Sequence, residues 1–447
     1  MLLRLLAIIL LVPALTVVTG CACPSGCRVP GTPSAPCPGE TSVVEGDPPD
    51  LVELVSADCQ LVPLPSPSET YELLSASTCQ CNAATNANLA NLVELERHWA
   101  KVVIECDTKN VRENYCLDRD LLALHAYDLR NTSASTALEA FYQLAGLEAQ
   151  QHYLLQGIDE TERTLERVDK LRSEGLELPE RIERSAIVAK LNELRDQKLQ
   201  LEFLRIQLNG QLQQLIGCPL NEHAFYWPQI DWTPDLTPVD VELELADGLA
   251  TRSDLRGLAL VLCKLKKPTL PVARGVLSFA DSTLGTVEPV DGWIHAARCF
   301  RCNEHEVPVR CRQLSMFYAE TEKLATAEIK SAAYKVNLQQ QRVVVVQQSV
   351  QEIRRQLFEL EETRDVNEVT VFELSNLRGQ LYEAESNLIS QVVALKLAEV
   401  GLGKAQGVLA LECGFEPVLC CEGCCDGDCC SCLGKNCKQK NCSKCAK

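Results

Sequence analysis

The stretch LRSEGLELPERIE, residues 171–183, interrupts a long segment that otherwise has the pattern of a helix. Gly175 can adopt the left-handed backbone conformation that ends a helix. Pro179 suits the first turn of the next helix, where its missing N–H is not needed. The stretch therefore predicts the tip of an antiparallel helical hairpin whose arms are residues 134–172 and 179–216.

Apolar residues recur at heptad positions on both sides of this tip. Such a period makes a narrow apolar seam that is buried only when it packs against another helix. Both arms are therefore expected to form a coiled coil. The residues are Leu147, Leu154, Ile158, Leu165 and Val168 before the tip, and Ile187, Leu194, Leu201, Leu208 and Leu215 after it.

A second helix, expected from about residue 320, repeats this arrangement and is interrupted at DVNEVTVFEL, residues 365–374. Asn367 tolerates the left-handed conformation, and Thr370 with Glu373 forms a capping box that begins the next helix. Gly175 and Asn367 lie 192 residues apart, which indicates an internal duplication of one hairpin. Its seven-residue rows are Ile329, Val336, Val343, Val350 and Leu357, then Leu374, Leu381, Leu388, Leu395 and Leu402.

These patterns divide the chain into six parts. Residues 1–20 have the pattern of a signal peptide, and residues 21–81 that of a tether rich in Pro and Cys. Residues 82–216 form the first helical repeat, which starts with a short helix at 82–104. Residues 217–315 are expected to be an irregular linker with one short helix from Val239. Residues 316–407 form the second repeat, and residues 408–447 a Cys-rich tail.

The N-terminus carries a candidate lipid anchor. Its apolar core, from Leu5 to Val18, is shorter than a membrane-spanning helix, so it is typical of a secretory signal. The following Thr19-Gly20-Cys21 completes a sequence that resembles the bacterial lipobox, in which the cysteine is lipidated. Cys21 is therefore the predicted lipidation site, and an ordinary cleaved signal with a nearby cysteine is the alternative.

Composition bears on the class of function. The net charge of −18, without a cluster of Lys and Arg beyond short runs, argues against a nucleic-acid partner. The six histidines form no HExxH motif, and no Gly-rich loop suited to phosphate is present, so we expect neither catalysis nor a cofactor.

The 25 cysteines indicate an oxidising compartment. One Cys-x2-Cys pair with nearby thiol and imidazole groups has the composition of a tetrahedral zinc site, although disulfides are the commoner state of cysteines in exported proteins. In the tail, CCEGCCDGDCCSCLGKNCKQKNCSKCAK, disulfides are likewise favoured over a metal–thiolate cluster, and their connectivity stays open. The candidate zinc ligands are His295, Cys299, Cys302, His305 and Cys311.

The duplicated hairpin resembles the outer-membrane efflux protein family, the TolC-like exit ducts of tripartite pumps. In that family a short motif marks the tip of each hairpin, another element follows the first repeat, and a glycine closes each repeat. The matching stretches are Glu174-Gly175-Leu176 and Val366-Asn367-Glu368 at the tips, Arg252-Ser253-Asp254-Leu255-Arg256 after the first repeat, and Leu215-Ile216-Gly217 and Ala405-Gln406-Gly407 at the ends.

The sequence departs from the family where membrane strands are expected. Family members insert two strands per repeat, so that a trimer closes a barrel, and each strand needs one apolar face. Residues 106–133 are charged on both alternating faces, and residues 264–315 offer only VARGVLSFA as a weak candidate. We therefore expect a mainly α fold of duplicated, long antiparallel coiled-coil hairpins, with little or no β-barrel.

The resemblance implies a non-catalytic component of an efflux or export system, bacterial and held at the periplasmic face of the outer membrane. It implies a homo-oligomer, expected to be a trimer, that forms part of a periplasmic helical duct. It also implies that the tips, at Gly175, Leu176, Val366 and Asn367, dock with a periplasmic adaptor of the pump. The alternative is a periplasmic coiled-coil lipoprotein that acts as a spacer or scaffold.

Overall fold

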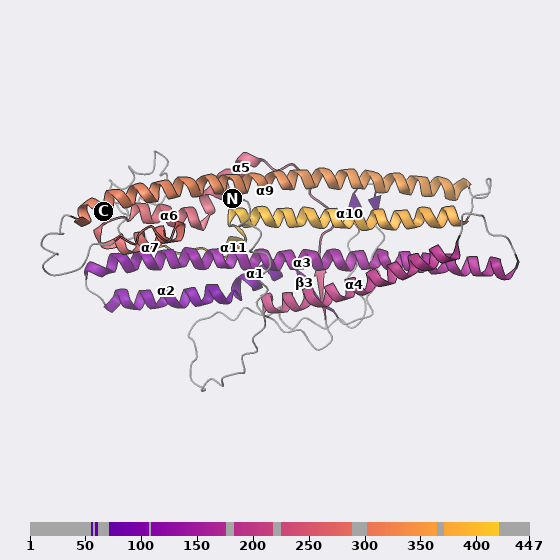
Figure 1. The fold of residues 1–447 in the computed structure, drawn as a ribbon, viewed down its shortest axis with the longest axis horizontal. Helices are drawn as coiled ribbons and strands as arrows, with labels where there is room; N and C mark the ends of the chain where they lie inside the picture. The colour runs from indigo at the N-terminus through magenta and orange to yellow at the C-terminus, as the bar shows by residue number, and fades with distance from the viewer. Residues whose placement is uncertain are drawn as a thin grey trace, which may run out of the picture. The chain divides into compact units, whose positions relative to one another are not determined.

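The computed structural model describes residues 55–56, 59–60, 71–106, 109–175, 183–217, 225–287, 302–363 and 371–419. Four long helices dominate this part of the chain (Figure 1). Helices α3 (Lys109–Ser173) and α4 (Arg184–Ile216) form the first hairpin, and helices α9 (Cys302–Thr363) and α10 (Val371–Gln406) form the second. The prediction of a mainly α fold built from two long hairpins is confirmed.

Glycines end the helices at the positions that the sequence indicated. Gly175, Gly217 and Gly407 follow α3, α4 and α10, and all three have φ between 73° and 77°. This left-handed conformation is accessible to glycine without a steric cost, which explains the sharp ends.

The second hairpin has the core that its sequence row predicts. Val343 and Val350 on α9 are completely buried, and Leu395 on α10 is also completely buried. These residues belong to one apolar cluster that joins α9 and α10 to α3. The seven-residue row of this hairpin is therefore confirmed from Ile329 to Val350 and from Leu388 to Leu402.

The row on α4 is less buried than predicted. Its residues Ile187, Leu194, Leu201, Leu208 and Leu215 are only partly buried. The fully buried apolar residues of this helix are instead Leu212 and Ile216, which pack against α1 and α3 in a second cluster. The predicted packing of α4 against another helix is present, with α3, but the row is only partly buried because few other elements cover this helix.

The N-terminal side of the first repeat contains two helices where one was predicted. Helix α1 (Ala76–Thr85) begins after Ser75, whose hydroxyl accepts a hydrogen bond from the Thr78 N–H, and it ends at Asn86. Helix α2 (Asn88–Cys106) follows and packs against the first part of α3. Residues 109–133, which had been considered for strands, belong to α3.

Four short strands form two small sheets among the described residues. Strands β1 (Val55–Ser56) and β2 (Cys59–Gln60) pair antiparallel. Strand β3 (Tyr71–Ser75) pairs in parallel with β4 (Phe225–Gln229), so that Tyr71 lies opposite Phe225. This second sheet joins the chain before α1 to the chain after α4.

The region 217–315 contains more helix than the sequence indicated. It holds α5 (Val241–Thr251), α6 (Ser253–Cys263), the 3-10 turn η1 (Lys267–Thr269) and α7 (Leu270–Ala280), and α9 already begins at Cys302. Two of the prolines lie in first turns, Pro268 in η1 and Pro271 in α7, where they are compatible with helix, whereas Pro308 lies inside α9. Asp240 caps α5 through the N–H groups of Glu242 and Leu243.

A disulfide closes the described chain on itself. Cys81 in α1 is bonded to Cys413, which follows the short helix α11 (Leu409–Glu412). Beside it, the Gln80 side chain donates hydrogen bonds to the Leu409 carbonyl and to Glu412. The start of the first repeat is thus attached to the residues that follow the second.

Candidate functional site

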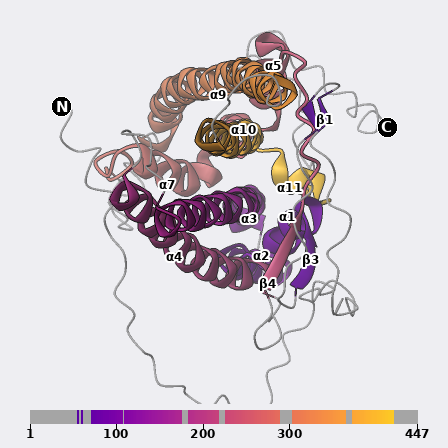
Figure 2. The same cartoon turned by 90° about the vertical axis from the view of Figure 1, so that its right-hand side faces the viewer.

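The four long helices form a layer, which we call the wall. They are arranged in the order α9, α10, α3, α4 (Figure 2). The inner pair, α10 and α3, contact each other, and the outer helices α9 and α4 pack mainly against one inner helix each. The wall therefore has two lateral edges, one formed by α9 and one by α4.

Polar contacts across the wall show which residues of neighbouring helices lie at the same position along the helix axes, which we call the same level. Arg205 on α4 bonds Glu148 on α3 at 2.6 Å, and Gln150 bonds Ser390 on α10 at 2.8 Å. Glu385 on α10 in turn pairs with Arg354 on α9. Residues near 205 on α4 are therefore level with residues near 350 on α9.

Large apolar side chains are exposed along both edges at this level. Leu199, Phe203 and Ile206 on α4 are each more than 60 % exposed. Their spacing of four and three residues places them on one side of the helix. On α9 the corresponding exposed side chains are Tyr334, Leu338, Val345 and Phe358, each more than half exposed. Exposed apolar side chains on both edges suit a protein–protein contact.

Two ion pairs that each contain a buried carboxylate join neighbouring helices of the wall. The guanidinium of Arg205 is buried with Glu148 and lies over the rings of Tyr71 and Phe225, at 5.2 and 4.3 Å from their centroids. Burial raises the pKa of Glu385, although the hydrogen bond and charge of Arg354 act in the opposite direction. These pairs attach α4 to α3 and α9 to α10.

Helix α3 also carries a buried histidine, His152. His152 is 7 % exposed, and its Nε2 is 3.0 Å from the Gln156 amide nitrogen. Its Nδ1 has no hydrogen-bond partner among the described residues. Burial lowers the pKa of His152 to about 4, so the ring is neutral at pH 7.

The two hairpins are held together close to their tips. The hydroxyl groups of Thr164 on α3 and Ser375 on α10 are 2.7 Å apart. Arg184 pairs with Asp169 across the base of the first tip, where both side chains are exposed. Gly175 ends α3 at the first tip, while Leu176, Val366 and Asn367 lie outside the described residues. Together with Gly175, these three stay the predicted docking residues.

The remaining predicted site residues are only partly covered by the structure. Cys21, His295 and Cys299 lie outside the described residues. His305 is exposed on the first turn of α9, and Cys311 packs against the apolar cluster of α6, α7 and α9. Among the described residues no group of three His, Cys, Asp or Glu side chains is placed to hold a metal ion. The zinc site therefore stays a prediction.

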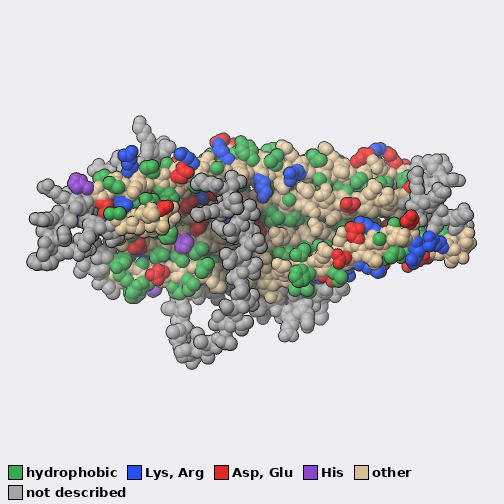
Figure 3. Space-filling model, in the orientation of Figure 1, with side chains coloured by type: hydrophobic (Ala, Val, Ile, Leu, Met, Phe, Trp, Pro, Cys, Tyr) green, Lys and Arg blue, Asp and Glu red, His purple; other side chains and the backbone are tan. Residues whose placement is uncertain are grey.

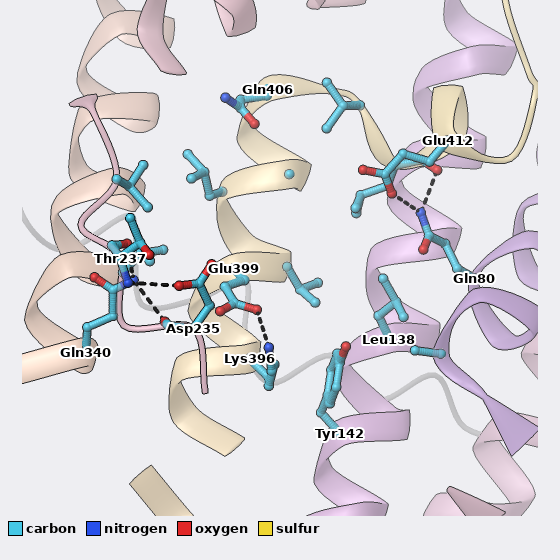
Figure 4. Close-up of a pocket in the computed structure, with 18 residues that line it drawn as sticks. Gln80, Leu138, Tyr142, Asp235, Thr237, Gln340, Lys396, Glu399, Gln406 and Glu412 are labelled. Atoms are coloured by element: carbon cyan, nitrogen blue, oxygen red, sulfur yellow. Dashed lines mark hydrogen bonds and ion pairs between the residues drawn. The ribbon is translucent and has the colours of Figure 1, made fainter. Parts of the chain in front are cut away.

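A cavity of about 410 Å³ lies where α1, α3, α9, α10 and α11 meet the segment 235–239 (Figure 4). Its polar lining groups are largely bonded to one another. Gln340 donates hydrogen bonds to the carbonyls of Asp235 and Thr237, and Lys396 pairs with Glu399 at 3.1 Å. The lining groups thus hold the segment against the wall, and we assign no ligand to the cavity.

Sequence reasoning missed the apolar edges of the wall. The period of seven identifies a seam but cannot separate a leucine that the chain itself buries from one that it leaves exposed. The three apolar residues Leu199, Phe203 and Ile206 between the heptad positions of α4 were the available signal. In the described helices, no stretch is both long and apolar enough to cross a membrane.

Comparisons with known proteins bear on the fold. Neither a family model nor a curated protein sequence matches the chain. Among solved structures, the chain is similar to the Campylobacter jejuni CmeC outer membrane channel, with 13 % identity, a TM-score of 0.55 and coverage of 74 % of this chain and 85 % of that one. It is similar to CusC with 12 % identity, a TM-score of 0.56 and coverage of 74 % and 91 %. The chain therefore has the fold of TolC-like outer-membrane channels.

Proposed function

We propose that the chain is a non-catalytic component of an export system and forms part of a helical duct in the periplasm. In this proposal three copies join edge to edge into a closed ring, and material passes through the ring without chemical change. The likeness to solved outer-membrane channels supports the role in export. The observation that carries the proposal is the pair of exposed apolar edges on opposite sides of the wall.

The edges suit a ring because they are different surfaces. When one surface of a subunit meets a different surface of the next, the contact is head to tail, and it closes a ring if the rotation allows. Ile206 on α4 is level with the part of α9 between Val345 and Phe358, so apolar side chains would meet apolar side chains. Burying them removes apolar surface from water, which is the main driving force of such association.

The mass of the detergent-solubilised particle tests this proposal. We expect the parent chain to have the mass of three copies and the variant Ile206→Glu to dissociate, because a charge would enter the apolar contact. The matched control is Leu155→Glu, an exposed residue on the inner helix α3 and therefore on neither edge. A parent chain that is monomeric at all concentrations would exclude the ring and leave the chain as a spacer or scaffold.

We further propose that the tips, at Gly175, Leu176, Val366 and Asn367, dock with a periplasmic adaptor of the pump. Support comes from the contact between Thr164 and Ser375, which keeps the two hairpins adjacent near this end. Leu176→Asp should weaken binding to the adaptor and leave thermal unfolding nearly unchanged, because substitutions outside the folded core cost little stability. An equal loss of binding and of folding would make this stretch only a turn.

The location at the outer membrane depends on lipid at Cys21 in this proposal. The lipobox-like sequence supports it. Cys21→Ser should release the protein from membranes, and mass spectrometry of the parent should detect the lipid. If the variant stays in the membrane pellet after a carbonate wash, lipid is not the main anchor.

A further inference from the structure

Helix α2 carries a row of exposed apolar side chains on the side turned away from α3. Leu89, Leu92 and Trp99 are each about 60 % exposed, and Leu95 is nearly half exposed. We call these four residues the α2 row, and Figure 3 shows hydrophobic side chains gathered over α2. The other side of the helix packs against α3 through the completely buried Ala90. A row of this size on a helix that buries only one side indicates a further contact surface.

The described chain after α11 runs from α1 toward α2. The disulfide between Cys413 and Cys81 attaches it to α1. The ring of Phe415 then lies against the guanidinium of Arg130 on α3, whose carbon is 4.4 Å from the ring centroid. Arg130 in turn donates a hydrogen bond to the Asn91 side chain on α2 at 2.9 Å. The chain has therefore reached the side of α2 by residue 415.

The last described residues lie beside the α2 row. Arg97 on α2 donates a hydrogen bond to the Val418 carbonyl, with 3.4 Å between Nη2 and the oxygen. Arg97 belongs to the same turn of α2 as Trp99. The described chain ends at Leu419, so residues 420–447 begin next to the row.

The segment 420–447 has the length and the composition to cover the row. The row from Leu89 to Trp99 is about 15 Å long, and about five extended residues span that length. Since Cys413 is already bonded to Cys81, ten cysteines are left in this segment, an even number that can pair within it. Sulfur is polarisable and packs favourably against aromatic rings such as that of Trp99.

Charge favours the same contact. Glu96 is exposed on the side of α2 that carries the row, and it makes no ion pair within the part of the chain that the structure describes. Residues 433–447 contain five lysines and no acidic residue. A lysine beside Glu96 would add an attractive polar contact at the rim of an apolar centre.

We propose that residues 420–447 dock on the α2 row of the same chain as a disulfide-linked cover. The bond between Cys81 and Cys413 holds the start of the cover beside its site, so the effective concentration for docking is high. A short disulfide-linked segment cannot build a large core of its own, and the row gives it an apolar surface to bury. Such docking gives the Cys-rich tail a role beyond the proposed export, and it does not depend on the ring.

Site-specific photo-crosslinking in the full, unreduced chain tests this docking. Leu92→p-benzoylphenylalanine should give a product of monomer mass in which, after reduction and digestion, the α2 peptide is linked to a peptide from residues 420–447. Trp99→p-benzoylphenylalanine, two turns along the row, is the second probe and should link to the same segment. Leu243→p-benzoylphenylalanine on α5 is the matched control and should give no such link. Leu243 is 58 % exposed, against 61 % for Leu92, but α5 packs on α9, across the wall from α2.

A change of charge gives a second readout in the same assay. Glu96→Lys, added to the Leu92 probe, should lower the yield of the link at least about threefold, because repulsion from the lysines replaces attraction. Glu166→Lys, at an exposed position of α3 near the tips, is the control and should leave the yield unchanged.

The outcomes are independent of the proposed function. The absence of a link to residues 420–447 from both probes would overturn the docking. Links at dimer mass to a second chain, or links to lipid or to a different protein, would also overturn it and identify what covers the α2 row. The mass of the solubilised particle bears on the ring alone, so either idea can fail without the other.

Discussion

The two hairpins share one plan, yet their outer helices are buried differently. On α9 the row through Val343 and Val350 is completely buried, whereas on α4 the row through Leu201 is only partly buried. The second hairpin is covered by α5 and by the segment that contains Trp232, which packs into its apolar cluster. The first hairpin instead holds α4 by ion pairs such as Arg205 with Glu148. The two hairpins thus share the seven-residue period, but the second depends more on apolar packing and the first more on ion pairs.

The largest effect on folding stability should come from a charge placed in the buried row of α9, with the same change in the partly buried row of α4 as the comparison. Val343→Asp buries a carboxylate among apolar groups, so we expect a loss of more than about 4 kcal/mol in the free energy of unfolding. Leu201→Asp, on the partly buried row, should cost only about 1 kcal/mol. Denaturant unfolding followed by circular dichroism measures both. Equal losses would contradict the difference between the two hairpins.

The ion pair of the first hairpin should have the next largest effect. Arg205→Met removes the guanidinium that pairs with the buried Glu148 carboxylate, and breaking a buried pair in this way costs about 3–5 kcal/mol. Adding Glu148→Leu should restore most of the stability, because both charges of the pair are then removed. Arg184→Met, which breaks the exposed pair with Asp169, is the control and should have little effect. A double variant as unstable as Arg205→Met would show that packing, not charge, causes the loss.

The smallest of the three effects depends on pH. The folded pKa of His152, about 4, lies below its ordinary value of 6.5, so the unfolded chain binds the proton more readily. Stability contributed by the neutral ring is present above pH 6.5 and is lost as the pH falls toward 4, by about 3 kcal/mol in total. His152→Gln should remove this part of the pH dependence. The position 192 residues later is Val344, so the second hairpin has no such group. An unchanged pH profile in the variant would contradict the assignment.

The sequence was sufficient to predict the two hairpins. Gly175, Gly217 and Gly407 end helices at the positions that the sequence indicated. The row from Ile329 to Val350 is buried, as its seven-residue period requires. These features are local, since a helix end and a seven-residue period each depend on neighbouring residues.

Features that depend on distant parts of the chain could not be predicted. Helix α7 was missed because its sequence VARGVLSFA was considered only as a weak candidate for a membrane strand. The pairing of Cys81 with Cys413 could not be chosen among 25 cysteines. The exposure of Leu199 and Trp99 depends on which elements cover α4 and α2, and this is a property of the tertiary structure.

If the chain is exported as proposed, the disulfide also sets an order of events. Cys81 and Cys413 are separated by 332 residues, so a chain that emerges from its N-terminus delivers the first thiol long before the second. In this proposal the bond forms only after both repeats have crossed into an oxidising compartment. Closure of the described chain is therefore a late step, and a product truncated before Cys413 would keep Cys81 available to react with other thiols. The pair thus distinguishes a fully exported chain from an incomplete one.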